Sequence, residues 1–332
     1  MSGVKVLFMG TPDFAVPSLR VLLEEGYDVI GTVTQPDRPK GRKRVLTPPP
    51  VKVFALEHGI PVLQPERLRR PEAVAEAAAL APDLIVTAAY GQILPKAVLA
   101  LPRCGCINVH GSLLPKYRGG APIQYAVMNG DRETGVTIMY MAEGLDTGDM
   151  ISRVVVPIAD EDTAGTLFDK LSAEGAELLR RTLPELVAGK IAAVPQNESE
   201  ATYSPTLKRE DERLDWSRPA RELFNRIRGL NPWPVAYTEH NGEILKVWKA
   251  KPPRERAGQA SPFAPSAAEP GTVVAVNAGG IEVAAGDGTL WLTEVQPAGR
   301  KAMDAAAYGR GGGIRAGDVL GRAAEPAGEG GR

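Results

Sequence analysis

At residues 106–115 the chain reads Cys-Ile-Asn-Val-His-Gly-Ser-Leu-Leu-Pro, which predicts a short buried strand that ends at a glycine. Side chains alternate between the two faces of a strand, so Asn108 and His110 point the same way. An amide and an imidazole aimed at one point can stabilise a developing oxyanion and move a proton. Asp146 follows in the glycine-flanked stretch 143–149, from which a carboxylate can reach the imidazole.

Strand and helix patterns alternate on the amino-terminal side of this stretch. Strands are predicted at 4–9, 29–34, 60–63 and 84–87, and helices at 11–25, 51–58 and 72–79. Thr11 is the expected N-cap of the first helix. This alternation predicts an α/β fold with a Rossmann-like, mostly parallel sheet and helices on both faces. Ligands of such sheets bind beyond the carboxyl ends of the strands. No Gly-x-Gly-x-x-Gly follows the first strand, so no nucleotide cofactor is expected, which argues against a dehydrogenase.

The pattern changes on the carboxy-terminal side. Strands at 134–141 and 149–158 flank Asp146, and Thr163 is the expected cap of a helix that extends to about 188. A helix at 218–228 precedes short strands of period two at 235–239, 244–249, 272–276, 281–284 and 290–295. Asn241-Gly242 between the first two of these strands predicts a tight hairpin. These short strands indicate a small OB-like β-barrel.

The chain therefore divides into predicted domains with different compositions. The predicted catalytic domain spans 1–193, a polar linker spans 194–208, the β-barrel domain spans 209–320, and a disordered tail spans 321–332. The Pro/Ala/Ser-rich stretch 252–270 is expected to be a mobile loop.

Composition excludes several classes of protein. The chain has 332 residues, 43% of them hydrophobic and 24% charged, and a formal net charge of -1, which is ordinary for a globular protein. No apolar run reaches the roughly 18 residues that a membrane helix needs, and residues 1–9 indicate a first strand instead of a signal peptide. Cys104 and Cys106 provide neither a disulfide framework nor a zinc site, so no metal is expected, and Cys106 is expected in the core. A cytoplasmic monomer that binds neither DNA nor a membrane is expected.

A basic stretch follows the second predicted strand. It has five cations in seven residues, without an acidic residue: Arg38, Lys40, Arg42, Lys43 and Arg44. Such a run is commonly a solvated surface. Its place on the ligand side of the sheet, however, also suits contacts with nucleic-acid phosphates.

Several motifs together resemble the folate-dependent formyltransferase family, over about the first 315 residues. They are Asn108-x-His110, Ser-Leu-Leu-Pro at 112–115, Arg-Gly-Gly-Ala-Pro at 118–122, Asp-Thr-Gly at 146–148, Gly-Thr-Pro-Asp-Phe-Ala at 10–15 and Asn-Pro-Trp-Pro at 231–234. Asn-x-His alone would be a weak signal, but the combination is specific.

The resemblance implies transfer of a formyl group from 10-formyltetrahydrofolate, a cosubstrate, to the α-amino group of methionine on initiator tRNA. It implies catalytic roles for Asn108, His110 and Asp146. The implied folate contacts are Ser112, Leu113, Leu114, Pro115, Tyr90 and Gly91. The implied tRNA contacts are Arg38, Lys40, Arg42, Lys43 and Arg44, with Arg42 as the principal candidate, together with the carboxy-terminal domain.

Structural roles remain alternatives for each of these residues. Asn108 can cap a turn, His110 can be structural, Asp146 can form a turn, and Leu113 and Leu114 can belong to the core. The alternative functions are formylation of a small amine, such as a nucleotide precursor or an amino sugar, hydrolysis of formyl-folate, and RNA binding by an inactive scaffold.

Overall fold

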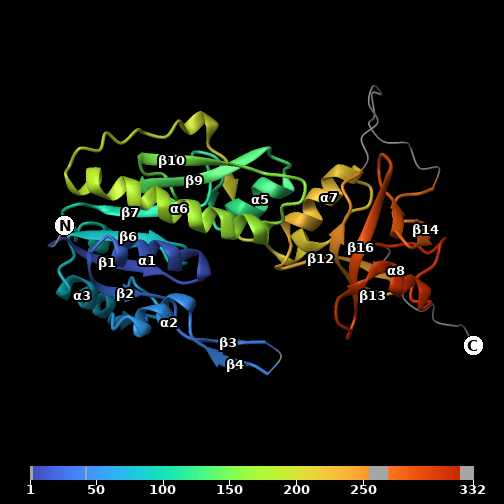
Figure 1. Ribbon diagram of the computed structural model, residues 1–332, viewed down its shortest axis with the longest axis horizontal. Helices are drawn as coiled ribbons and strands as arrows, with labels where there is room; N and C mark the ends of the chain where they lie inside the picture. The colour runs from blue at the N-terminus through green and yellow to red at the C-terminus, as the bar shows by residue number, and fades with distance from the viewer. Residues whose placement is uncertain (1–2, 42, 254–267, 322–332) are drawn as a thin grey trace, which may run out of the picture. The chain divides into compact units, whose positions relative to one another are not determined.

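Seven strands form the sheet that carries the candidate site (Figure 1). Their spatial order is β10 (Met150–Pro157), β9 (Glu133–Tyr140), β7 (Cys106–His110), β6 (Leu84–Ala88), β1 (Lys5–Gly10), β2 (Asp28–Val33) and β5 (Val62–Leu63). The strands from β7 to β5 are parallel, whereas β9 pairs antiparallel with both β7 and β10. The prediction of a mostly parallel sheet is confirmed. The computed structural model describes residues 3–41, 43–253 and 268–321.

Helices cover both faces of this sheet. Parallel sheets are usually covered in this way, so that their strands are buried on both sides. On one face, α1 (Val16–Glu24) is joined to α6 (Ala164–Val187) by ion pairs from Arg180, and Gly175 of α6 packs against Val109 of β7. On the other face, α3 (Pro71–Ala79) and α4 (Lys96–Leu99) share a buried cluster with Leu7, Ile85 and Cys106. Burial raises the pKa of the Cys106 thiol to about 12, in keeping with its predicted place in the core.

The start of the first helix differs from the prediction. Thr11 is not an N-cap, because Pro12 holds that position and no side chain caps the turn. The Thr11 hydroxyl instead donates to the carbonyl oxygen of Tyr90 at 2.9 Å and accepts from the Gln35 amide at 3.3 Å. A short 3-10 turn, η1 (Asp13–Ala15), comes before α1 instead. At the start of α6 the cap is as expected, since the Thr166 amide donates to the Thr163 hydroxyl at 3.2 Å. Tertiary contact from a distant loop therefore overrides the local capping preference at Thr11.

The basic stretch is a hairpin, which its run of charges does not predict. Strand β3 (Arg38–Lys40) pairs antiparallel with β4 (Val45–Thr47), and the helix α2 (Pro50–Glu57) follows. The backbone of Arg44 at the turn has a φ of 49°. Arg42 lies outside the described residues.

The chain forms two compact units, each built from several segments. The first contains 1–122, 133–157 and 168–206, and the second contains 123–132, 158–167 and 207–332. Within the first unit, β8 (Arg118–Gly119) pairs with β11 (Tyr203–Ser204), which follows the short turn η2 (Glu198–Glu200). Most of the predicted linker is thus packed in the first unit, and the predicted domain boundaries stay a prediction.

The second unit is an antiparallel sheet with a helix that packs one face against its core. The strand order is β12 (Ala236–His240), β13 (Glu243–Ala250), β16 (Thr289–Pro297), β15 (Gly280–Ala284) and β14 (Val273–Asn277), with β17 (Met303–Asp304) beside β16. The remaining elements of this unit are α5 (Pro122–Met128, of which all but Pro122 belongs here), the 3-10 turn η3 (Arg209–Glu212), α7 (Ala220–Gly229) and α8 (Ala305–Arg310).

Residues near the carboxy-terminal end of the described chain link the two edge strands of this sheet. Leu320 forms a bridge with His240 of β12, and Val319 forms one with Thr272 next to β14. The turn between β12 and β13 is the predicted one, with positive φ angles of 51° at Asn241 and 79° at Gly242. The core of this unit includes Phe224 of α7 and Leu292 of β16. In the described parts of the chain, no helix is both long and apolar enough to cross a membrane.

Candidate active site

The side chain of Asn108 is oriented by the neighbouring strand. The register of β6 and β7 places Thr87 opposite Asn108. The Thr87 hydroxyl donates to Oδ1 of Asn108 at 2.8 Å. Because this oxygen is engaged, the Nδ2 group is the available donor, and it has no hydrogen-bond partner among the described residues. An amide donor held in this way is suited to stabilising an oxyanion.

His110 is buried and has a defined orientation. Its Nε2 atom lies 3.0 Å from the carbonyl oxygen of Tyr117. A carbonyl only accepts, so Nε2 carries the hydrogen and donates it. Nδ1 then faces Asp146, whose Oδ2 is 3.7 Å away. That separation suits an ion pair but is too long for a hydrogen bond, so the imidazole is oriented by Tyr117 more directly than by the carboxylate.

Asp146 is held in an unusual backbone conformation. Its φ angle is 52°, a region that non-glycine residues seldom adopt. Its Oδ2 accepts a hydrogen bond from the Gly119 amide at 2.8 Å. Gly119 itself has a φ of 119°, and a Cβ there would lie 2.7 Å from the carbonyl oxygen of Ser204. The close glycine backbone in the Arg-Gly-Gly motif therefore allows β8 to reach both Ser204 and the carboxylate.

A further side chain, outside the predicted site residues, contacts this loop. The Gln196 amide donates to the carbonyl oxygens of Asp146 and Gly148, each at 2.8 Å. Gln196 lies in the predicted linker, where no local pattern indicates a role. Thr87 was also missed, although its place at the carboxyl end of a strand was a usable signal.

The predicted folate segment 112–115 is held in place by hydrogen bonds from its own polar groups. The Ser112 hydroxyl donates to the carbonyl oxygen of Lys116 at 2.6 Å, and the Leu114 amide donates to the Thr137 hydroxyl at 3.1 Å. Ser112, Leu114 and Pro115 are buried, and the peptide bond before Pro115 is cis. Leu113 is partly exposed. A ligand would therefore meet the backbone of this segment and the Leu113 side chain.

The other predicted folate residues, Tyr90 and Gly91, follow β6. Tyr90 is buried, and its carbonyl oxygen already accepts from Thr11 and from Gln35, at 2.9 and 3.2 Å. Burial also raises the pKa of its hydroxyl, which has no hydrogen-bond partner in the described structure. Gly91 has a φ of 89° and only Gln35 near the position of a Cβ. Backbone groups are thus the parts of this turn that a ligand can use.

Large apolar side chains are exposed in the turn after β6 and in the loop that carries Asp146, and such side chains suit a flat heterocycle. Ile93, two residues beyond Gly91, is 79% exposed, and Leu145, next to Asp146, is 55% exposed. Exposed large apolar side chains beside a polar cluster are common at ligand sites. These residues fit a folate cosubstrate in chemical character.

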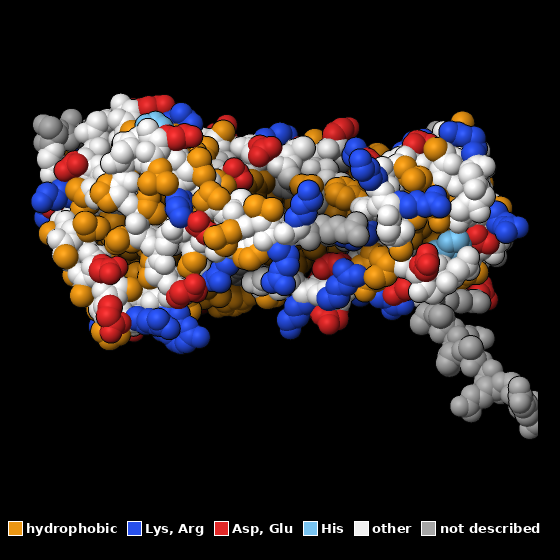
Figure 2. All heavy atoms as spheres, turned by 90° about the horizontal axis from the view of Figure 1, so that it is seen from below, with side chains coloured by type: hydrophobic (Ala, Val, Ile, Leu, Met, Phe, Trp, Pro, Cys, Tyr) orange, Lys and Arg blue, Asp and Glu red, His pale blue; other side chains and the backbone are white. Residues whose placement is uncertain are grey.

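The basic hairpin carries both paired and unpaired cations. Arg38 forms an ion pair with Glu66 at 3.1 Å, with both side chains 59% exposed. Lys43 and Arg44 are exposed and have no acidic partner among the described residues. On the face shown in Figure 2, Lys and Arg side chains lie among Asp and Glu side chains. This face is therefore mixed in charge and is not basic as a whole.

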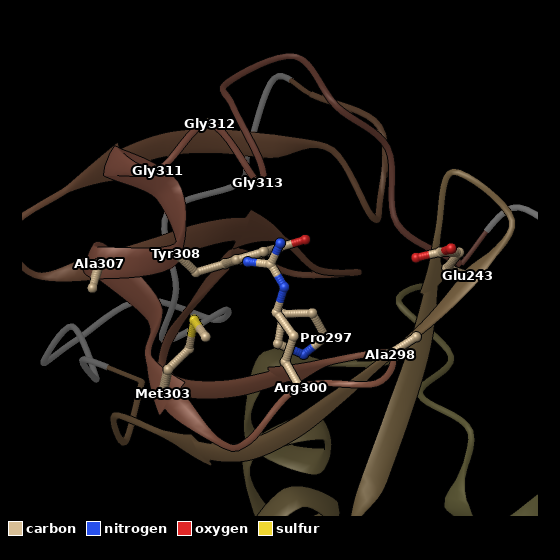
Figure 3. A pocket seen from close by; sticks show the side chains of 10 residues that line it. All are labelled: Glu243, Pro297, Ala298, Arg300, Met303, Ala307, Tyr308, Gly311, Gly312 and Gly313. Carbon is tan, nitrogen blue, oxygen red and sulfur yellow. The ribbon is translucent and has the colours of Figure 1, made fainter.

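A cavity of about 410 Å³ lies in the second unit, and its lining residues are far in sequence from the residues described above. It is lined by Glu243, Arg300, Tyr308 and the glycine turn 311–313, among others, and Figure 3 shows the Arg300 side chain extending into it. None of the predicted site residues lines it. Among the described residues there is no group of three His, Cys, Asp or Glu side chains that could hold a metal ion.

Two family models match the chain. One, described as formyl transferase, matches residues 4–183, and the other, formyl transferase C-terminal domain, matches residues 206–313. The chain belongs to the formyl transferase family. The resemblance inferred from the motifs is thereby confirmed at the level of the family.

Similar members of the formyl transferase family are known from several bacteria. The methionyl-tRNA formyltransferase of Bacillus subtilis (strain 168) is 60% identical over 318 residues, which cover 96% of this chain and 98% of that protein. The methionyl-tRNA formyltransferase of Geobacillus thermodenitrificans (strain NG80-2) is 57% identical over 311 residues, covering 93% and 95% of the two chains.

Solved structures of other proteins share the fold. A sugar 3N-formyl transferase, WlaRD, determined in the presence of dTDP and 5-N-formyl-THF, has a TM-score of 0.62 and 19% identity, covering 90% of this chain and 99% of that one. HypX from Aquifex aeolicus, in complex with tetrahydrofolic acid, has a TM-score of 0.60 and 20% identity, covering 92% and 47%. At such low identity the similarity establishes the architecture alone.

Proposed function

We propose that this protein transfers the formyl group of 10-formyltetrahydrofolate to the α-amino group of methionyl initiator tRNA. The observation that carries the proposal is the 60% identity to a methionyl-tRNA formyltransferase over 96% of the chain. The arrangement of Asn108, His110 and Asp146 supports it, because these groups suit acyl transfer to an amine.

The reaction forms one bond and breaks another at the formyl carbon. The amine nitrogen attacks this carbon and gives a tetrahedral intermediate with a negatively charged oxygen. Nδ2 of Asn108 donates a hydrogen bond to that oxygen, since Thr87 occupies the other end of the amide. One such donor is worth about 10²–10³ in rate. The bond between the formyl carbon and the folate nitrogen then breaks, and no covalent enzyme intermediate is needed.

His110 and Asp146 are assigned the proton transfers and the stabilisation of the charged groups. With Nε2 held by Tyr117, the Nδ1 edge of His110 is the one that turns to the reacting atoms. In the charged imidazole Nδ1 also carries a hydrogen, and it donates this hydrogen to the intermediate oxygen or transfers it to the departing nitrogen. Asp146, 3.7 Å from Nδ1, stabilises the charged imidazole and accepts, through water, the proton lost by the amine.

Recognition of tRNA is assigned to the basic hairpin and to the second unit. Lys43 and Arg44 are exposed cations that can neutralise phosphates, and Arg38 and Lys40 lie on the paired strand. Arg42, which is outside the described residues, remains the predicted principal contact. The presence of a second unit does not by itself separate the two acceptors, because the sugar 3N-formyl transferase covers 90% of this chain. The 60% identity to a methionyl-tRNA formyltransferase is what favours the tRNA acceptor over a small amine.

The test is transfer of labelled formyl from 10-formyltetrahydrofolate to methionyl initiator tRNA, with methionyl elongator tRNA and free methionine as parallel acceptors. We expect rapid transfer to the initiator tRNA alone. Formylation of a small amine, or hydrolysis of the donor in place of transfer, would exclude the proposed acceptor while retaining the chemistry of the site.

The three catalytic assignments have their own test. Substitution of Asn108, His110 or Asp146 by Ala should abolish turnover while the far-ultraviolet circular dichroism of the protein stays unchanged. Near-normal turnover of any one variant would remove that residue from the mechanism.

A further inference from the structure

Residues 196–204 contact the backbone around both acid–base residues, although they lie in the segment predicted to be a linker. The Ser204 hydroxyl donates to the carbonyl oxygen of Tyr117 at 3.1 Å, and this same oxygen accepts from Nε2 of His110. The Thr202 hydroxyl accepts from the Tyr117 amide at 2.9 Å. At the other side of the site, Gln196 binds the loop that carries Asp146.

The Gln196 contact uses every hydrogen-bonding group of the amide. Its two N–H groups donate to the carbonyl oxygens of Asp146 and Gly148, and its Oε1 accepts from Nε of Arg118 at 3.0 Å. A glutamine side chain suits this place because it offers two donors and one acceptor in a plane. Glutamate cannot donate to either carbonyl.

Arg118 fixes the position of Gln196. Its side chain is fully buried, and its remaining guanidinium nitrogens donate to the two carboxylate oxygens of Glu198 at 2.9 and 2.7 Å. These hydrogen bonds from Arg118 also hold the pKa of Glu198 below its ordinary value. Because the Arg118–Glu198 pair is bidentate, the guanidinium plane has little freedom to rotate. The Nε–H group of Arg118 therefore points at Oε1 of Gln196 in a fixed direction.

The loop needs such support because of the conformation of Asp146. A non-glycine residue at a φ of 52° persists only when its surroundings impose it. Rotation out of this region would carry Oδ2 away from both the Gly119 amide and His110. The Asp146 side chain thus depends for its place on a backbone that Gln196 holds.

We propose that Gln196 is a positioning residue for formyl transfer, which holds Asp146 at His110 through the carbonyl oxygens of Asp146 and Gly148. This inference rests on the proposed function, because it takes Asp146 as a catalytic group. It adds a residue from outside the three catalytic ones and from a distant part of the chain.

The test compares Gln196→Met, which keeps the length of the side chain and removes its hydrogen bonds, with the intact protein. We expect kcat for formyl transfer to fall by up to about 10²-fold, as for a small misplacement of a catalytic group. The KM values for donor and acceptor should not change. Thr182→Val, which keeps the size of the side chain and removes its hydrogen bond with Ser152 in the first unit, is the matched control and should leave kcat unchanged.

A double-mutant cycle separates positioning from general stability. In an Asp146→Asn background, Gln196→Met should have little further effect on kcat, because the group that it positions is already disabled. Equal fold losses in both backgrounds, or an unchanged kcat in Gln196→Met, would overturn the proposal. If Gln196→Met does not fold, Gln196→Glu keeps the acceptor for Arg118 and should show the same loss of kcat.

Hydrogen exchange provides a measurement that is independent of turnover. The amides of residues 144–148 should exchange faster in Gln196→Met than in the intact protein, while those of the sheet do not change. Unchanged exchange would contradict the inference even if no acceptor is formylated. If the intact protein formylates no acceptor but Gln196→Met still exchanges faster at 144–148, the proposed function fails. The structural role of Gln196 at the Asp146 loop then stands.

Discussion

At the scale of single residues, the direction of one amide depends on one hydroxyl. Thr87 donates to Oδ1 of Asn108, and its oxygen also lies 3.0 Å from the carbonyl oxygen of Ile107. Threonine is common in strands because of its branched Cβ, but valine would fill this buried position equally well. The hydroxyl group, and not the size of the side chain, is therefore what distinguishes threonine from valine at this position.

We expect Thr87→Val to lower kcat by up to about 10²-fold, because Asn108 can then rotate its donor away from the reacting oxygen. Thr87→Ser keeps the hydroxyl and should keep kcat, while the missing methyl group lowers the free energy of unfolding by about 1 kcal/mol. Steady-state kinetics and urea denaturation of both variants measure these effects. Equal kcat values for the two variants would contradict the assigned role.

At the scale of elements, the β3–β4 hairpin carries two exposed cations, Lys43 and Arg44, that have no acidic partner among the described residues. Its strands are three residues each, and Val45 and Leu46 are more than half exposed, at 61% and 64%. A hairpin with so little burial contributes little to stability by itself. Burial in the hairpin therefore gives no reason for these two cations, which are the ones assigned above to the tRNA.

Charge reversal at Lys43 and Arg44 (K43E with R44E) should raise KM for the tRNA and leave KM for the formyl donor unchanged. The slope of log affinity against log salt should become shallower by about 0.7–0.9 for each phosphate that the protein no longer neutralises. The matched control reverses two other exposed cations of the first unit, Arg153 and Lys190. The same increase in KM for both pairs would mean that net charge, and not the hairpin, governs binding.

Helix α7 is anchored by an ion pair that should depend on pH. Arg221 donates to Asp160 through both terminal nitrogens, one of them at 3.0 Å, and this interaction holds the pKa of Asp160 below its ordinary value. A lowered folded-state pKa stabilises the protein above the unfolded pKa, about 3.9, and this contribution disappears as pH falls through the folded value.

Asp160→Asn should therefore lower the free energy of unfolding at pH 7 by no more than about 1 kcal/mol, because both side chains are partly exposed. The difference from the intact protein should shrink as the pH falls below about 3.9. Urea denaturation over a range of pH measures it. A difference that grows on acidification would have the wrong sign for this pair.

At the scale of the whole molecule, the second unit is not a continuous piece of chain. Its segment 158–167 supplies the carbonyl oxygens of Ala159 and Asp162, which accept from the buried Arg228 guanidinium. Burial lowers the pKa of Arg228, as expected where a charged group is removed from water. A cut at residue 207 separates this arginine from its acceptors.

A fragment of residues 207–332 should thus be less stable than the same residues in the intact chain. Each missing hydrogen bond to the charged guanidinium costs about 1.5–3 kcal/mol. Differential scanning calorimetry of the fragment and the intact protein tests this. A fragment that melts together with the last transition of the intact chain would show that the 158–167 segment is dispensable.

The sequence determined the parts of this protein that local physics controls. The alternation of apolar strands and helices identified the parallel sheet, and Asn241-Gly242 identified the hairpin, because periodicity and turn chemistry act over a few residues. The motifs identified the family. They also placed Asn108 and His110 on one face of β7, because strand geometry alone requires it.

Only the tertiary structure decided how distant segments complete the site. Thr11 donates to Tyr90 instead of capping a helix, and the charge run at 38–44 became a paired hairpin. Gln196 reaches Asp146 across fifty positions of chain, and Tyr117, not Asp146, holds the ring of His110. Such interactions depend on where the fold brings backbone carbonyls together, and no local pattern of residue types encodes that.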